Sequence, residues 1–436
     1  MADAHGSGPC DSNIMRVQVP FPALYDYLKA RHCGKQCLLP YRNLWSDLDG
    51  TEKLMRRIKG ILYTEKFRFE AGVLTIEGDR IASVEPCDEK ELTAEEKGRY
   101  ILPGLVDIHL HGCAGADFCD GTVEAMRAIA DYELTHGITS ICPATMTLPV
   151  ERLTDICAAC ASASKTEVLR AGISMGDVIR GIYLEGPFIS MEKKGAQNSA
   201  YIRKPNPEML VKLQNAAQGL IRIVAIAPET EGAMDCIRDR KKDFRFSIAH
   251  TCADYETARK AIEAGASHVT HLYNAMPPYM HREPGVVGAA AESDSVTAEL
   301  ICDGYHIHSS VVRNTFRLFG AERMVLVSDS MMAAGMDDGE YSLGGQKVQV
   351  RGSLATLKDG TLAGSVTNLY DCMKMAVRMG VPREDAVRAA TFNPAMVIGI
   401  DTEYGSLREG KMADILITDC ELGLWEVIKS GITAIN

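Results

Sequence analysis

Long hydrophobic runs and an excess of positive charge are both missing from this chain. No segment of its 436 residues approaches the roughly 18 uninterrupted apolar residues of a membrane-spanning helix. The first residues, MADAHGSGPCDSN, contain neither the basic nor the apolar region of a signal peptide. Asp and Glu outnumber Lys and Arg by 58 to 47, which argues against a broad surface for nucleic acid or lipid. We therefore expect a cytoplasmic globular protein with no nucleic-acid or membrane partner, in which any site for an anion is local.

The 14 cysteines lack the pattern of a disulfide framework or a zinc finger. Several lie inside apolar runs, such as Cys142 in TSICPAT, and are typical of small buried hydrophobic residues. Two pairs have a suggestive spacing but no second Cys or His pair to complete a zinc site, namely Cys33 with Cys37 and Cys157 with Cys160. The last two lie on one face of a predicted helix, where core packing explains them better.

The pattern of the chain changes near both ends. Residues 1–54 show no clear period and predict an N-terminal extension of unknown role. Residues 55–100 alternate as short strands do, and the segment from 399 to 436 has a similar pattern. We expect these two ends to build one small β-sandwich domain, with turns in its first part at Ala71–Gly72 and Gly78–Asp79.

The middle of the chain, residues 101–398, alternates apolar strands with helical stretches. Eight segments have a strand pattern: GLVDIHLH, ITSICPAT, IRGIYLEG, IRIVAIAPE, FRFSIAH, SHVTHLYNA, TAELICDG and RMVLVSDS. Eight strand–helix units predict an α/β fold of the (β/α)₈ TIM-barrel type. A doubly wound sheet is the alternative, but it normally uses fewer strands, and no Gly-x-Gly-x-x-Gly turn follows the first strand.

Five of these strand segments end in residues that bind metals or transfer protons. His109 and His111 are two positions apart, so on a strand both imidazoles point to one face. Because the C-terminal ends of barrel strands face one pocket, distant residues can meet there. Each residue also has a structural interpretation, such as a helix cap at His250 or Asp329 or an ion pair at Glu185. Taken together, the placements favour a metal centre: His109, His111, Glu185, His250, His271 and Asp329.

These motifs resemble a known family over roughly residues 55–420. LPGLVDIHLHG and the late Asp329 are typical of the amidohydrolase superfamily. Further stretches resemble its N-acetylglucosamine-6-phosphate deacetylase branch: YLEGPFIS with KKGAQ, SIAHT, THLYNAMPPYMHREPG, ICDGYHIH, VSDSMMAAG, TLAGS and TFNPA. Among them, LEGPF, HLYNAM followed by HREPG, and DGYHIH are the more specific to this branch. The resemblance implies a barrel enzyme that hydrolyses the acetamide of a phosphorylated amino sugar.

The resemblance also implies roles for the metal-binding residues. Glu185, His250 and His271 would bind one divalent ion, while His109 and His111 are available for a second ion that Glu185 bridges. These ligands suit zinc or ferrous iron, and one or two ions per subunit are both open. A bound ion activates water, while Asp329 would take its proton and deliver it to the departing amine.

The remaining matches concern the substrate. By resemblance, Asn274 and Ala275 would contact the ligand, and Arg282 with His306 would face its phosphate. Because this phosphate site can draw on a neighbouring subunit in the family, a homodimer is implied. Several relatives have a histidine where this chain has Gln197, which donates a hydrogen bond but carries no positive charge. The full set of expected substrate contacts is Ala196, Gln197, Asn274, Ala275, Arg282, His306, Leu362, Ala363 and Gly364.

The preferred function is hydrolysis of N-acetyl-D-glucosamine 6-phosphate to D-glucosamine 6-phosphate and acetate in amino-sugar catabolism. The galactosamine epimer is the nearest alternative, because it differs at one hydroxyl that the sequence cannot place. A non-catalytic scaffold is the alternative from another class, although a scaffold has no physical need of the full ligand set. Superfamily hydrolases of cyclic amides or phosphotriesters usually have a bridging lysine, where this chain has Glu185.

Overall fold

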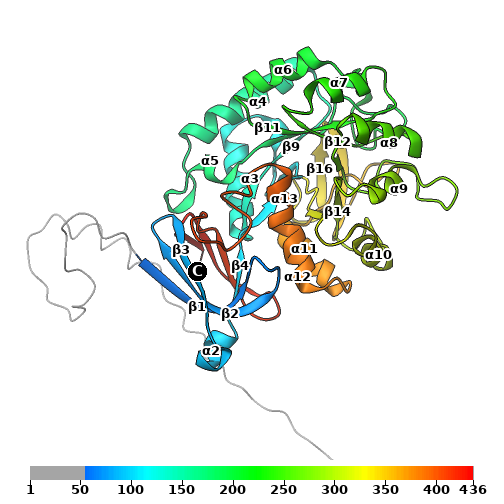
Figure 1. Cartoon of the computed structure of the whole chain (residues 1–436). Coiled ribbons are helices and arrows are strands. Elements are labelled where there is room, and N and C mark those ends of the chain that lie inside the picture. Colours follow the sequence, from blue (N-terminus) through cyan, green and yellow to red (C-terminus); the bar gives the residue numbers. More distant parts are fainter. Residues whose placement is uncertain (1–54, 436) are drawn as a thin grey trace, which may run out of the picture. The chain divides into compact units, whose positions relative to one another are not determined.

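Strands from both ends of the chain pair in one seven-stranded sheet in the computed structural model, which describes residues 55–435. The predicted extension, residues 1–54, lies outside the described residues. An antiparallel pairing of Tyr100–Pro103 with Ile415–Thr418 joins the two ends (Figure 1). In spatial order the strands are β21 (Ile432–Ile435), β20 (Leu424–Lys429), β19 (Ile415–Thr418), β4 (Tyr100–Pro103), β1 (Met55–Tyr63), β2 (Phe69–Glu77) and β3 (Arg80–Pro86).

Alternating apolar residues of this small sheet build a separate core. Leu74 and Ile76 of β2 pack with Ile415 and Ile417 of β19, all 4% exposed or less. The turn predicted at Gly78–Asp79 joins β2 to β3, but the turn predicted at Ala71–Gly72 is wrong, because Gly72 lies inside β2. A Cβ at Gly72 would lie 2.8 Å from the Glu85 carbonyl oxygen, so this glycine permits a close approach of β3 rather than a turn. The sandwich form of this domain and its exact boundaries stay predictions.

A ring of parallel strands forms the larger part of the described chain. Each predicted strand segment contains one of them: β5 (Leu105–Asp107), β8 (Ile138–Ile141), β10 (Ile182–Leu184), β11 (Ile221–Ile226), β12 (Arg245–Ile248), β13 (His268–Val269), β14 (Thr297–Ile301) and β15 (Met324–Val327). The short β9 (Ala144–Thr145) follows β8, and β9 to β15 form one curled sheet while β5 pairs with β8. Backbone bonds from Asp329 N to His109 O (2.9 Å) and from His111 N to Ser330 O (2.7 Å) join the last strand region to the first.

Successive residues of the parallel strands point to opposite sides of the sheet. On β10, Tyr183 belongs to the inner core, while Ile182 and Leu184 pack outward against helices. The inner core also contains Ala395 and Val397 of α13 (Phe392–Val397), so this helix packs against the inward-facing side chains of the parallel strands. The interior is therefore filled by side chains below the ends of the strands, as a packed barrel requires.

Helices cover the outer face of the parallel strands (Figure 1). Those with ten or more residues are α3 (Val123–Thr135), α4 (Val150–Thr166), α6 (Pro207–Ala216), α8 (Tyr255–Ala264), α10 (Ser309–Phe319) and α11 (Leu369–Arg378). The shorter ones are α5 (Met175–Val178), α7 (Ala233–Arg240), α9 (Gly285–Glu292) and α12 (Arg383–Ala390), while α2 (Ala94–Lys97) lies beside the small sheet instead. Cys157 and Cys160 are fully buried in α4, which confirms core packing for this pair, and all described cysteines are free thiols.

An inserted three-stranded sheet follows the last barrel strand. It consists of β16 (Gly339–Leu343), β17 (Gln346–Arg351) and β18 (Leu354–Thr356). Its buried residues Leu343, Val348 and Ala355 pack with Met146 and Met331 near the C-terminal ends of the barrel strands. A smaller hairpin of β6 (Gly112–Cys113) and β7 (Ala116–Asp117) follows the first strand. Among the described helices, none has the length and hydropathy needed to cross a membrane.

Candidate metal centre

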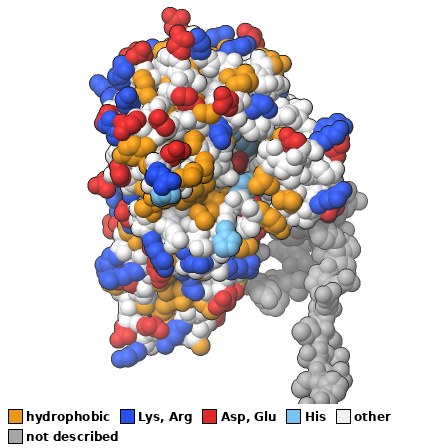
Figure 2. Space-filling model, turned by 90° about the vertical axis from the view of Figure 1, so that its right-hand side faces the viewer, with side chains coloured by type: hydrophobic (Ala, Val, Ile, Leu, Met, Phe, Trp, Pro, Cys, Tyr) orange, Lys and Arg blue, Asp and Glu red, His pale blue; other side chains and the backbone are white. Residues whose placement is uncertain are grey.

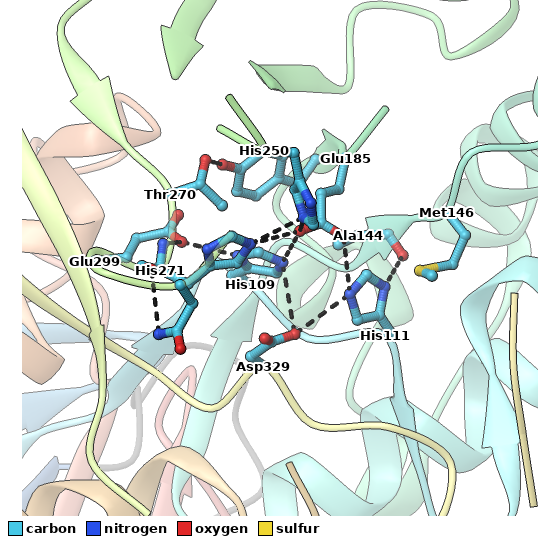
Figure 3. A network of polar contacts seen from close by, with 12 residues as sticks. His109, His111, Ala144, Met146, Glu185, His250, Thr270, His271, Glu299 and Asp329 are labelled. Atoms are coloured by element: carbon cyan, nitrogen blue, oxygen red, sulfur yellow. Dashed lines mark hydrogen bonds and ion pairs between the residues drawn. The ribbon is translucent and has the colours of Figure 1, made fainter. Parts of the chain in front are cut away.

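The predicted metal ligands follow the barrel strands by one or two residues. Glu185 comes directly after β10, and His250, His271 and Asp329 each lie two residues beyond β12, β13 and β15. His109 also lies two residues beyond its strand, β5, so the His-x-His pair is on an extension of the strand rather than within it. All of these ends face the same side of the parallel sheet, and the side chains therefore converge (Figure 3).

Glu185, His250 and His271 form the first ligand group. The Nε2 atoms of both histidines lie 3.1 Å from Oε1 of Glu185 and 3.1 Å from each other. All three side chains are buried, with Glu185 3% exposed. Two imidazole nitrogens and a carboxylate oxygen at such short mutual distances form the donor set of a divalent ion such as zinc.

His109, His111 and Asp329 form the second group. His111 Nε2 lies 3.3 Å from Asp329 Oδ1 and 3.2 Å from Glu185 Oε2, while His109 Nε2 lies 3.8 Å from Asp329 Oδ1. His109 Nε2 and Asp329 Oδ1 are buried and make no hydrogen bond within the described chain. Buried polar atoms normally have a partner, so these two fit a positive ion placed between them.

Glu185 lies between the two groups. Its Oε1 faces His250 and His271, and its Oε2 faces His111. A carboxylate with one oxygen toward each group can bridge two cations and reduce their mutual repulsion. The donor set therefore fits either one ion at the first group or a bridged pair.

The site concentrates negative charge in a buried place. Burial alone would lower the pKa of His111, but the carboxylates of Asp329 and Glu185 outweigh it and raise this pKa to about 10. Burial would likewise raise the pKa of Asp329 and Glu185, yet the neighbouring histidines, His109 first, hold both below their usual range. Both carboxyl groups are therefore ionised at neutral pH, which favours a bound cation.

Three of the ligand residues have an unusual backbone conformation. His250, His271 and Asp329 have positive φ angles of 42°, 28° and 47°, which non-glycine residues seldom adopt. Such strain persists where the surrounding structure fixes it, and it is concentrated at functional sites. Neighbouring Gly195 (φ 52°) lies against His250, since a Cβ there would be 3.4 Å from the imidazole Cε1. The sequence motifs gave no sign of this strain.

Hydrogen bonds to the Nδ1 atoms orient three of the imidazoles. His250 Nδ1 lies 2.8 Å from the carbonyl oxygen of Lys193, and His111 Nδ1 lies 3.3 Å from that of Ala144. A carbonyl oxygen only accepts, so each Nδ1 carries a proton, and each Nε2 is the ring nitrogen that can bind an ion in place of a proton. His109 has a carboxylate in this position instead, with Nδ1 2.8 Å from Oε2 of Glu299.

Glu299 is the main residue of the centre that the sequence interpretation missed. It lies inside β14 and is fully buried. Burial would raise the pKa of Glu299, but the neighbouring His109 outweighs this effect and holds the pKa well below the usual range. The signal was present, because an acidic residue in the middle of the apolar segment TAELICDG is unusual for a buried strand. What it contacts depends on the neighbouring strand, which the sequence does not indicate.

A cavity of about 370 Å³ opens beside the two ligand groups. In Figure 2, histidine side chains lie in a recess of the surface that hydrophobic side chains flank. The expected substrate residues that line the cavity are Ala196, Gln197, Asn274, Ala275, His306, Leu362 and Gly364. Lining residues that the sequence interpretation did not name are Met146, Glu192, Lys193, Gly195, Leu343 and Thr361.

Gln197 is held by protein groups on both sides of its amide. Its Nε2 donates to Glu185 Oε2 at 2.6 Å, and its Oε1 accepts from the backbone N–H of Thr147 at 2.6 Å. The side chain is 2% exposed. In this arrangement the amide orients Glu185, whereas the sequence interpretation expected it to contact the substrate.

His306 lies in the cavity wall, which also includes Lys193, and its imidazole suits a phosphate. Its Nδ1 lies 2.6 Å from Oδ2 of Asp303, and this carboxylate outweighs burial and raises the pKa of His306. Two expected substrate residues are placed differently. Arg282 lies exposed on the loop between β13 and α9, outside the cavity lining, and Ala363 is fully buried behind the lining residues Leu362 and Gly364.

Comparison with known proteins places this geometry in a family. The sequence profile described as "Amidohydrolase family" matches residues 100–435. The N-acetylglucosamine-6-phosphate deacetylase of Bacillus subtilis (strain 168) is 37% identical over 369 residues, covering 83% of this chain and 92% of that protein. The N-acetylgalactosamine-6-phosphate deacetylase of Escherichia coli O157:H7 is 34% identical over 372 residues, covering 85% and 96%.

A solved structure is also similar. The N-acetyl-D-glucosamine-6-phosphate deacetylase of Mycobacterium smegmatis, a mutant in complex with N-acetyl-D-glucosamine-6-phosphate, superposes with a TM-score of 0.81 at 31% sequence identity. The match covers 88% of this chain and all of the other chain.

Proposed function

The chain belongs to the amidohydrolase family, and we propose that it hydrolyses the acetamide of N-acetyl-D-glucosamine 6-phosphate to D-glucosamine 6-phosphate and acetate. One observation carries this proposal. Two buried ligand groups, with Glu185 between them and Asp329 in the second group, lie on a cavity large enough for a sugar phosphate. The relatives named as deacetylases of this substrate support it.

Asp329 is the proposed proton-transfer group. Divalent ions, when bound by the histidines and Glu185, lower the pKa of water and stabilise negative charge on the carbonyl oxygen. Asp329 begins ionised, because the nearby histidines hold its pKa below the usual range, so it can accept a proton from the attacking water. It then protonates the amide nitrogen as the C–N bond breaks, and acetate and the free amine leave.

The cavity wall supports recognition of a phosphorylated sugar. The His306 imidazole, paired with Asp303, has a raised pKa and can donate to a phosphate in the cavity, whose wall also includes Lys193. Arg282 lies outside the lining of its own chain, and we propose that it reaches the phosphate site of a second copy in a homodimer. The same proposal includes zinc or iron as the metal and a cytoplasmic location. It also includes a small β-sandwich domain, formed by residues 55–100 and 399–436.

Acetate release by the metal-reconstituted protein tests the function. We expect rapid release from N-acetylglucosamine 6-phosphate and much slower release from the unphosphorylated sugar, since a missing phosphate leaves the cationic groups unpaired. The galacto epimer is the second candidate, favoured by the similarity to the E. coli O157:H7 enzyme, and faster release from it would exchange the two assignments. No release from any of the three, with metal bound, would contradict the proposal and favour another amidohydrolase reaction, whereas a metal analysis that finds none bound would favour the scaffold alternative.

A further inference from the structure

We propose that Glu299 is a positioning residue that sets up the second ion site through His109, so that the chain binds a bridged pair of ions rather than one. The inference rests on the proposed metal centre and concerns residues outside the ligand set. Glu299 lies in β14, to the left of His109 and His271 in Figure 3, and its side chain is fully buried.

The contacts of Glu299 determine how His109 presents its ring. Glu299 Oε2 accepts from His109 Nδ1 at 2.8 Å, which places the ring proton on Nδ1. Nε2 of the same ring then carries its lone pair toward Glu185 Oε1 at 3.5 Å and Asp329 Oδ1 at 3.8 Å. Without a carboxylate at Nδ1, the other tautomer would direct an N–H toward the ion position.

The negative charge of Glu299 distinguishes His109 from the other ligands. His250 and His111 use backbone carbonyl oxygens at Nδ1, which are neutral acceptors. A carboxylate acceptor makes the imidazole a stronger donor to a metal, because it stabilises positive charge on the ring. Among the described ligands, His109 is therefore the imidazole whose metal-donor strength a carboxylate increases.

Glu299 also touches the first ligand group, but in a different manner. Its Oε2 accepts from the backbone N–H of His271 at 3.0 Å and makes no contact with that imidazole. Its Oε1 lies 3.0 Å from Nε2 of His268, whose other ring nitrogen lies 2.6 Å from the hydroxyl of Thr297. Glu299 thus contacts the ring of His109 but only the backbone of His271. We therefore expect loss of Glu299 to weaken metal binding at the second site more than at the first.

Metal binding to the full-length chain tests this inference without substrate. We expect wild type to bind two Zn²⁺ ions per chain, and Glu299→Ala to bind the second ion about 10 to 100 times more weakly, with the first little changed. Glu299→Gln keeps an oxygen that can accept from His109 and His271 but loses the charge, so it should fall between the two. With Mn²⁺, paramagnetic resonance should show a spin-coupled pair in wild type and a single uncoupled ion in Glu299→Ala at the same metal concentration.

Tyr183→Phe is the matched control. Tyr183 is fully buried with its ring centroid 4.7 Å from that of His109, and its hydroxyl contacts Thr270 rather than a ligand. This variant disturbs the same core and should keep the coupled pair. Equal weakening of both ions in Glu299→Gln, or two ions at wild-type affinity in Glu299→Ala, would overturn the inference. A wild-type chain that binds one ion would overturn it too, while leaving a one-metal deacetylase intact.

Discussion

Two regions of the described chain bury charged groups in opposite ways. At the metal centre, His109 Nε2 and Asp329 Oδ1 have no hydrogen-bond partner, and ligand residues adopt strained backbone angles. In the small sheet, Lys429 at the end of β20 is fully buried but donates to Asp414 Oδ2 at 2.5 Å, and Asp414 Oδ1 accepts from the backbone of Ser430 at 2.9 Å. Burial lowers the pKa of Lys429, and the ion pair with Asp414 offsets part of this effect.

The difference separates a site for a ligand from a site for stability. A buried polar atom without a hydrogen-bond partner destabilises the fold unless something else binds it, so its presence indicates a ligand. A buried charge with complete protein partners needs nothing more and serves the fold itself. We therefore expect changes at the metal centre to lower activity with little loss of stability, and changes at Lys429 to do the reverse.

Replacing Asp329 with Asn should have the largest effect on activity. The amide keeps the shape of the side chain but cannot accept the proton of water, so we expect kcat to fall by about 10² to 10⁴. Kinetics on N-acetylglucosamine 6-phosphate and the metal content of the same sample measure this. Metal content and thermal stability should stay near those of wild type, and a variant with normal turnover would remove Asp329 from its proposed role.

Replacing Asp414 with Ala should cause the largest loss of stability. Lys429 would then be buried without its partner, and we expect the free energy of unfolding to fall by about 3 to 5 kcal/mol. Denaturant unfolding measures the loss, while kcat of the folded protein should be unchanged. The double variant Asp414→Leu with Lys429→Met removes both charges and should recover most of the loss; equal destabilisation in the single and double variants would contradict the pairing argument.

The partly buried surface pair of Arg56 and Glu426 should give the smallest effect. Its two bonds are 2.6 and 2.7 Å long, and the side chains are 37% and 12% exposed. Burial raises the pKa of Glu426, but Arg56 outweighs it and the net pKa is lowered, so the stabilisation is present above pH about 4.5 and disappears as the pH falls. Glu426→Gln should cost less than about 1 kcal/mol at pH 7 and nothing at pH 3, measured by unfolding at both values. A loss that persists at pH 3 would show that packing, not charge, is responsible.

Sequence patterns located the strands better than the turns. Each of the predicted barrel segments contains an observed strand, because apolar runs that are buried on both faces have few other solutions. The turn at Ala71–Gly72 failed, since a glycine indicates either a turn or a close approach of two strands. Which one applies depends on the partner strand, and this is a tertiary contact.

The same distinction between local pattern and tertiary contact applies to the candidate site. The sequence by itself determined the residue types and their places after the strands, because a ligand needs an imidazole or a carboxylate at the open end of the barrel. Only the tertiary structure decided that Glu185 lies between two ligand groups, that Gln197 orients Glu185, and that Arg282 lies outside its own cavity. The role of Glu299 was likewise decided by the tertiary structure, because its contact with His109 joins residues 190 positions apart. Local pattern fixes which side chains a strand presents, whereas their partners are set by the closure of the barrel.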